Sequence, residues 1–227
     1  VEGRRLAVNA PTLGDLDGLA GLEVEEVAGG VEDLAERCVS DGDADRGAGV
    51  GDGLAALKGG APKAIERALR DDSENIRALT LRIARRHRLP VEPLARRLAR
   101  DASALVRREC AVSLHRLTSA EAIRIWVTLA EQHDGKDRWY LEALGIGERG
   151  KESACLAAWL KKTGDRWETR MGRDIVWRSR APEAAALLAE LLMNPDVRGA
   201  EHPRLLRALD FHTAKARTAA VAVVLNG

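Results

Sequence analysis

Apolar residues recur at helical spacing through most of the chain. Ile76, Leu79 and Ile83 form one such stripe, backed by Ala84. Spacings of three and four residues place side chains on one face of a helix. Ser73 precedes the stripe, and serine favours the position just before a helix. The pattern therefore predicts an amphipathic helix over 74–88.

A second stripe follows Ser103. It consists of Val106, Cys110, Leu114 and Leu117. The same spacing argument predicts a second amphipathic helix, capped by this serine.

Further helices are predicted as far as the C-terminus. Ser119 is expected to cap a helix over 120–133, with Asp134 and Gly135 as the turn after it. Six more patterns cover about 137–147, 151–162, 168–179, 182–193, 203–211 and 213–225. The short connections between them favour antiparallel helical hairpins.

The pattern also divides the chain. Residues 1–30 are rich in glycine and acidic side chains, and we expect an irregular lead-in there. A helical pattern begins with "VEDLAERCV". We therefore expect a helical repeat domain over 31–227, with its clearest repeats in 62–117.

Two of the predicted helices repeat each other. "LRDDSENIRALTLRIA" and "ARDASALVRRECAVSL" share the core D-x-S-x-x-[IV]-R, with Asp71 matching Asp101 and Arg77 matching Arg107. We expect the serine to cap the helix and the aspartate to favour its positive end. The arginine is expected to pair with an aspartate of a stacked neighbour.

This segment resembles HEAT repeats, which are helical hairpins whose second helix often begins with Asp and a Val-Arg pair, as in "DASALVRRECAVSL". "NPDVRG" suggests a further copy. The resemblance implies an all-α fold, namely a HEAT-like α-solenoid of five or six antiparallel helical hairpins.

A narrower resemblance covers about 100–212. "LAEQHDGKDRWYLEALGIG", "GDRW", "RDIVWRSR" and "HPRLLRALDFH" are similar to the helical-repeat region of large bacterial proteins identified as membrane-bound dehydrogenases. That family implies a sugar-dehydrogenase-like β-propeller before the repeats and a c-type haem domain after them. It also implies a quinone in other domains, and an exported or periplasmic location. No cofactor is expected in this chain, because C-x-x-C-H and the propeller are both missing from it.

Charge is unevenly distributed, although the whole chain carries only +1. Residues 1–61 hold 5 basic and 13 acidic side chains, whereas residues 62–116 hold 14 basic and 7 acidic. This asymmetry bears on partners. The basic segment contains Arg82, Arg85, Arg86, Arg97 and Arg108, which we regard as a possible surface for an anionic partner. Local acids could instead neutralise these arginines, or the acidic first 61 residues could be their partner.

Three cysteines, Cys38, Cys110 and Cys155, lie far apart, and we expect each to behave as a small buried apolar residue. The five histidines are not spaced as a zinc site, and no metal or catalytic residue is predicted. The longest apolar run, "AAVAVVL", is far short of a membrane span, so no membrane contact is expected from this segment.

"GIGERG" has the G-x-G-x-x-G spacing of a dinucleotide-binding turn. Such a turn needs a preceding β-strand, but "DRWYLEALGIG" has a helical period. We therefore interpret Gly145, Gly147 and Gly150 as the end of a helix and a tight turn.

All five tryptophans fall within about fifty residues: Trp126, Trp139, Trp159, Trp167 and Trp177. They predict packing between helices, and the alternative is a groove that stacks sugars or bases.

The leading functional hypothesis is a non-catalytic scaffold or protein-interaction module, a fragment of a larger multidomain oxidoreductase-type protein. Its partners would be a protein or flanking domains of the same polypeptide. The alternative is binding of nucleic-acid phosphates by an arginine-rich groove.

Overall fold

The computed structural model describes residues 61–86 and 88–226. These residues form helices and turns, with no strand among them, which confirms the all-α prediction. The predicted lead-in over 1–30, the helical pattern at 31–39 and Cys38 lie outside the described residues. The chain divides into two compact units, Val1–Leu94 and Ala95–Gly227.

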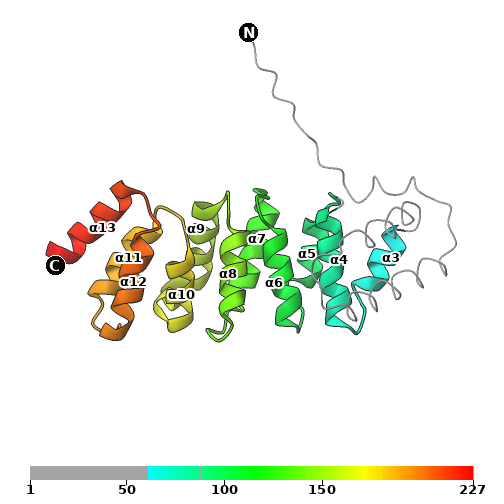
Figure 1. Cartoon of the computed structure of the whole chain (residues 1–227), viewed down its shortest axis with the longest axis horizontal. Helices are drawn as coiled ribbons and strands as arrows, with labels where there is room; N and C mark the ends of the chain where they lie inside the picture. Colours follow the sequence, from blue (N-terminus) through cyan, green and yellow to red (C-terminus); the bar gives the residue numbers. More distant parts are fainter. Residues whose placement is uncertain (1–60, 87, 227) are drawn as a thin grey trace, which may run out of the picture. The chain divides into compact units, whose positions relative to one another are not determined.

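In the first unit, α3 (Ala61–Ala68) packs against α4 (Glu74–Arg86), as Figure 1 shows. The buried face of α4 matches the predicted stripe only at Ala84. Ala78, Leu81 and Ala84 are buried, whereas Ile76, Leu79 and Ile83 are half-buried. The small alanines allow a close approach, so the longer predicted side chains lie at the edges of the face. The helix α5 (Glu92–Leu98) follows and spans the boundary between the units.

The second unit continues with helices close to the predicted positions. They are α6 (Ala104–Ser113), α7 (Ala120–Ala130), α8 (Arg138–Gly147), α9 (Glu152–Thr163), α10 (Arg170–Arg178), α11 (Ala184–Met193), α12 (His202–Leu209) and α13 (Ala214–Asn226). Two short 3-10 helices, η3 (Gly164–Glu168) and η4 (Gly199–Glu201), precede α10 and α12. The second predicted stripe is confirmed for Val106 and Cys110 of α6 and for Leu114, its C-terminal cap residue, which are fully buried. Leu117 lies beyond the helix and is half-buried.

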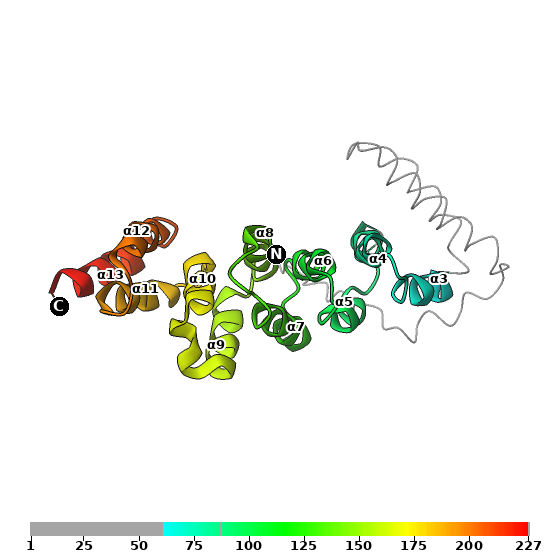
Figure 2. The same ribbon diagram turned by 90° about the horizontal axis from the view of Figure 1, so that it is seen from below.

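Helices two apart in sequence pack against each other in this unit. The even-numbered helices α6, α8, α10 and α12 contact one another in order, and α7 contacts α9 as α11 contacts α13. Seen as in Figure 2, the even-numbered helices lie on one side of α7, α9 and α11. Each even-numbered helix from α8 to α12 therefore has a neighbour from the preceding hairpin.

The core between these helices contains two aromatic anchors that also form hydrogen bonds. Trp126 of α7 is 1% exposed, and its indole N–H donates to the Leu144 carbonyl of α8 at 2.8 Å. Tyr140 of α8 is buried, and its hydroxyl donates to the Leu129 carbonyl of α7 at 2.8 Å. Buried aromatic side chains with a polar tip need such partners. The two bonds run in opposite directions and fix α8 on α7.

The helix starts show how the repeated motif works. The Ser119 hydroxyl caps α7 by accepting from the Ala122 N–H at 3.0 Å, as predicted. The Ser103 side chain forms no capping hydrogen bond, so that prediction is wrong. The Asp101 carboxylate instead accepts from the Ser103 N–H at 2.8 Å, and Asp71 accepts from Ser73 at the same distance. Aspartate closes the turn because its side chain reaches the backbone two residues on.

The arginine of the motif contacts the backbone of the turn. Nη1 of Arg107 donates to the carbonyls of Asp101 and Ala102 at 2.6 and 2.9 Å. Nη1 of Arg77 donates to the carbonyls of Asp71 and Asp72 at 2.7 and 3.0 Å. The guanidinium therefore locks the turn before its own helix, and its pairing with a neighbour's aspartate stays a prediction.

A third copy of this turn occurs at α10, where sequence comparison had not found one. The Thr169 hydroxyl caps α10 at Gly172, and Nη1 of Arg173 donates to the Glu168 carbonyl at 2.7 Å. Thr169 and Arg173 have the spacing of Ser103 and Arg107. This arginine additionally pairs with Glu201 at 3.1 Å through two nitrogens, so here it does contact the next hairpin.

Candidate functional site

The stretch with dinucleotide-turn spacing follows a helix. Gly147 is the last residue of α8, and Gly145 lies two residues before it. Gly150 adopts a φ of 89° in the turn before α9. No strand precedes these glycines, in agreement with the predicted helix end. Gly145 lies in the last turn of α8 and Gly147 ends it, as predicted.

Close packing explains the two helical glycines. A Cβ added to Gly147 would overlap the Ala111 carbonyl of α6, and one added to Gly145 would overlap the Arg178 guanidinium of α10. Glycine therefore lets α8 approach a helix on each side. The absence of a side chain at these two positions allows close helix packing, and phosphate binding is not needed to explain the glycines.

Two buried charged side chains follow within the same stretch. The Glu148 carboxylate, in a residue 1% exposed, accepts from the Arg180 N–H at 3.2 Å and from the Ser179 hydroxyl at 3.3 Å. The Lys151 ammonium, in a residue 6% exposed, donates to the Leu114 carbonyl at 2.8 Å and to the Gly147 carbonyl. Glu148 thus binds the segment after α10, and Lys151 binds the end of α6. We call this pair the α8–α9 brace.

Burial raises the pKa of the Glu148 carboxyl to about 7, although the Arg180 N–H and the Arg178 charge oppose that rise. The crevice beside it is lined by residues including Trp126, Leu144 and Ile175, and it leaves no room for a water molecule. The carboxyl therefore lacks space for a substrate, and its position suits a structural contact.

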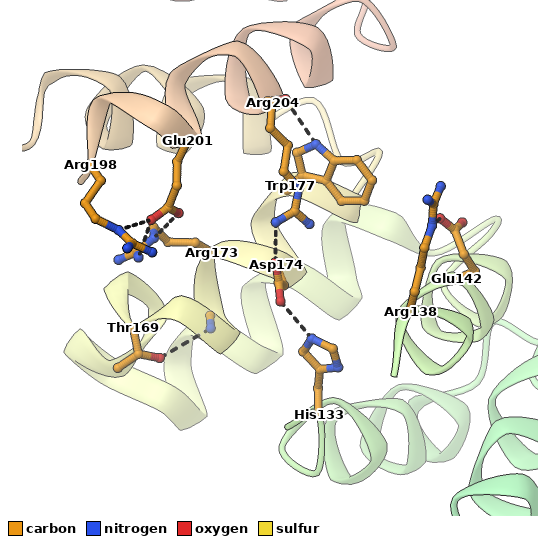
Figure 3. A network of polar contacts seen from close by, with 11 residues as sticks. His133, Arg138, Glu142, Thr169, Arg173, Asp174, Trp177, Arg198, Glu201 and Arg204 are labelled. Carbon is orange, nitrogen blue, oxygen red and sulfur yellow. Dashed lines mark hydrogen bonds and ion pairs between the residues drawn. The ribbon is translucent and has the colours of Figure 1, made fainter. Parts of the chain in front are cut away.

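A second polar group joins the turn after α7 to α10 and α12, and Figure 3 shows it at close range. His133 Nε2 and Asp174 Oδ2 are 3.1 Å apart, and Arg204 Nη1 donates to Asp174 Oδ1 at 2.6 Å. The Arg204 guanidinium also stacks 4.2 Å from the centre of the Trp177 ring, whose indole N–H donates to the Arg204 carbonyl. We call these four residues the Asp174 network.

The Asp174 carboxylate is the central group of this network. Burial alone would raise the pKa of this carboxyl, but hydrogen bonds from His133 and Arg204 hold the pKa below its usual value. Only 2% of the His133 side chain is exposed, and its Nδ1 has no hydrogen-bond partner. A His–Asp pair can orient a general base, but a nucleophile must lie within reach. The two described cysteines do not qualify: burial raises the pKa of the Cys155 thiol to about 12 and that of Cys110 further still.

Two more ion-pair clusters connect neighbouring even-numbered helices. Glu142 of α8 accepts from Arg178 of α10 at 2.8 Å. Arg138 lies 3.9 Å from the same carboxylate, as Figure 3 shows. Glu201 lies 3.1 Å from Arg173 and 3.8 Å from Arg198. Each carboxylate therefore pairs with two arginines and links two hairpins.

The arginines predicted as an anionic-partner surface are divided between the two units. Arg82, Arg85 and Arg86 are exposed on one face of α4, in the first unit. Arg97 is exposed on α5, and Arg108 of α6 pairs with Asp137 at 3.5 Å. Arg108 is thus engaged at the start of α8. Binding of nucleic acid by these five residues stays a prediction.

The tryptophans differ sharply in burial. Trp126 and Trp159 are buried, and Trp167 and Trp177 are half-buried, in line with the packing prediction. Trp139 is 72% exposed and does not pack between helices, so the prediction is wrong for this residue. Its position beside the buried Tyr140 did not indicate this, because adjacent residues of α8 such as Tyr140 and Leu141 are both buried.

Within the described residues, no group of three His, Cys, Asp or Glu side chains could hold a metal ion. None of their helices has the length and apolar character needed to cross a membrane.

The chain was compared with protein families, curated proteins and solved structures. No family model, curated protein or solved structure matches it.

Proposed function

We propose that the chain is a HEAT-like α-solenoid that acts as a non-catalytic scaffold. The support for this fold is the regular contact between helices two apart. In the turns before α4, α6 and α10, an arginine side chain donates a hydrogen bond to the backbone in the same way. Repeat arrays gain their stability from such contacts between neighbouring units.

The observation that carries the scaffold function is the use of buried polar groups. In the described part of the second unit, Glu148, Lys151 and Asp174 each form hydrogen bonds to another hairpin or to the turn that leads to it. Buried charges are costly unless they are paired, and paired ones favour a single arrangement. These groups hold the hairpins at fixed spacing.

The scaffold would space and orient flanking domains of the same polypeptide or a partner protein. The resemblance to membrane-bound dehydrogenases favours an oxidoreductase-type parent, with haem and quinone chemistry in its other domains. A solenoid suits this task because it offers a long rigid surface.

Distance measurements between spin labels test the proposal. Nitroxides at Thr118→Cys and Thr218→Cys would be measured in the full chain, with Cys38, Cys110 and Cys155 replaced by alanine. Both label positions are exposed and lie in the second unit. We expect a single narrow distance distribution. A broad distribution in the parent chain would contradict the scaffold function.

A matched pair of variants shows whether the α8–α9 brace is responsible. Glu148→Ala removes a buried carboxylate that joins two hairpins, and we expect it to broaden the distribution. Glu190→Ala removes an exposed carboxylate of α11 and should leave the distribution unchanged. Equal distributions in the two variants would show that the brace does not set the spacing.

A further inference from the structure

Trp139 lies on the solvent side of α8, although its neighbours are held firmly. Tyr140 is bonded to α7, and the Arg107 guanidinium lies 5.5 Å from the centre of its ring. The Asp137 carboxylate caps the helix by accepting from the Tyr140 N–H at 3.1 Å and pairs with Arg108. The start of α8 is therefore fixed, and the 72% exposure of the indole is a property of the fold.

Two further apolar side chains accompany the indole. Ile146 follows two helical turns later on α8 and is 39% exposed. Met171 at the start of α10 is 42% exposed, and its Cγ lies 3.6 Å from the position that a Cβ on Gly135 would occupy. Gly135 belongs to the turn that leads into α8, so Met171 lies beside that turn. Exposed apolar side chains gathered in this way are typical of interaction sites.

The charges around Trp139 are arranged unequally. The acidic side chains are partly engaged within the fold: Asp137 caps α8, and Glu142 accepts from Arg178. The basic side chains are more exposed. The Arg138 side chain is 81% exposed, although it also lies 3.9 Å from Glu142.

Lys136 and Arg170 are also exposed, and neither forms an ion pair with another described residue. We call Lys136, Arg138, Trp139, Arg170 and Met171 the Trp139 patch.

The one exposed acid of this turn is already occupied. Asp134 accepts from the Lys136 N–H at 2.9 Å, and the pKa of its carboxyl is lowered, chiefly by that bond. Its role is to close the turn before α8. Its carboxylate therefore stabilises the backbone of the turn, while the side chains of Lys136 and Arg138 beside it are exposed.

We propose that the Trp139 patch docks an acidic segment of a partner protein that also carries aliphatic side chains. The partner's carboxylates would lie against Lys136, Arg138 and Arg170, and its aliphatic groups against the indole and Met171. Tryptophan and arginine are the side chains that most often dominate binding energy at interfaces. Complementary charge sets the choice of partner and accelerates the encounter. This inference rests on the proposed scaffold function and names the partner chemistry.

Titration with a synthetic peptide tests the proposal. The probe is a peptide of repeated Glu-Glu-Leu units, and peptides of Lys-Lys-Leu and Gln-Gln-Leu units serve as controls. Binding to the full chain is followed through the indole N–H signals in NMR, with the Trp139 signal assigned by its loss in Trp139→Phe. We expect the Glu-Glu-Leu peptide to shift this signal more than those of Trp126 and Trp159, and to bind less tightly as salt is raised.

Variants then distinguish binding at the Trp139 patch from nonspecific charge attraction. Trp139→Ala should weaken binding of the peptide about tenfold or more, which corresponds to an interface hot spot. The double variant with Lys136→Gln and Arg170→Gln should also weaken binding of the peptide. Lys161→Gln, at an exposed position on α9, should leave binding unchanged. The proposal is overturned by any of three results: no shift of the Trp139 signal at millimolar peptide, equal binding of the Lys-Lys-Leu peptide, or unchanged binding by Trp139→Ala. The spin-label distances do not depend on this outcome, so the scaffold proposal stands or falls separately.

Discussion

Glu148 and Lys151 are three residues apart and bind in opposite directions. The Glu148 carboxylate accepts from the Ser179 hydroxyl and the Arg180 N–H that follow α10, and the Lys151 ammonium donates to the Leu114 carbonyl that ends α6. One short turn thus holds the hairpin before it and the hairpin after it. Four predictions follow from this turn, from the glycines before it and from the Asp174 network.

The stability of the second unit should depend on pH through Glu148. In the fold this carboxyl keeps its proton up to a pKa of about 7, because burial disfavours the charged form, whereas its usual pKa is 4.5. The raised pKa adds stability that is complete below pH 4.5 and is lost as the pH rises through 7. The loss should be about 3 kcal/mol at most. Urea unfolding of the full chain and of Glu148→Gln at pH 5 and pH 8 would measure it.

Glutamine has no such proton, so Glu148→Gln should remove most of this pH dependence. Glu190→Gln, at an exposed position on α11, should retain it. Parallel pH profiles for the parent and Glu148→Gln would contradict the raised pKa.

Lys151→Met should destabilise the protein by about 1–3 kcal/mol, because the Leu114 and Gly147 carbonyls lose a buried donor while the side-chain volume is kept. The exposed Lys161→Met should change the free energy of unfolding by no more than about 0.5 kcal/mol. Chemical denaturation gives both values. If the two variants were equally stable, the hydrogen bonds of the Lys151 ammonium would have no net effect.

Gly147→Ala should be more damaging than Gly145→Ala. At position 147 the added methyl group meets the Ala111 carbonyl, which is fixed in α6, and overpacking of this kind costs about 1–3 kcal/mol. At position 145 it meets the end of the flexible Arg178 side chain, which can move away. The better helix propensity of alanine, about 1 kcal/mol, then offsets much of the cost.

Gly199→Ala is the control for these two variants, since a methyl group there meets nothing within 4 Å. Thermal unfolding would rank the three. A ranking with Gly145→Ala as the least stable would show that Arg178 cannot leave Glu142.

Asp174 and Arg204 should be energetically coupled. A double-mutant cycle with Asp174→Asn and Arg204→Gln is expected to give about 1 kcal/mol, a moderate value because the Arg204 side chain is 44% exposed. The lowered pKa of Asp174 adds stability above its usual pKa of 3.8, and this is lost as the pH falls through the folded pKa. The coupling measured by denaturation should therefore be smaller at pH 3 than at pH 7. A coupling near zero at pH 7 would contradict the pairing.

The helices of the described residues were largely predictable, because apolar spacing and turn residues determine where a helix can lie. The buried stripe of α6 followed the apolar pattern, whereas that of α4 did so only in part, since alanine packs closely but gives little signal in a hydrophobic pattern. Ser119 caps its helix as predicted, but Ser103 does not, because the aspartate two residues earlier takes over the backbone.

The polar contacts could not be predicted from local pattern. Asp174 meets residues 41 positions earlier and 30 positions later, and one sequence does not reveal which distant groups converge. The buried state of Glu148 was equally hidden, since glutamate after a helical glycine usually faces solvent. The exposure of Trp139 was hidden as well, because adjacent residues of α8 such as Tyr140 and Leu141 are both buried.

The locked turn before α6 has a consequence for the order of folding. Its hydrogen bonds join Asp101, Ala102, Ser103 and Arg107, so the loop that must close is very short. Contacts this local form quickly and at little cost in chain entropy. The turns before α4 and α10 share the arginine contact, and each can begin its helix before a neighbouring hairpin is present. The chain thus contains several separate starting points for folding, and the long-range braces join structures that have already formed.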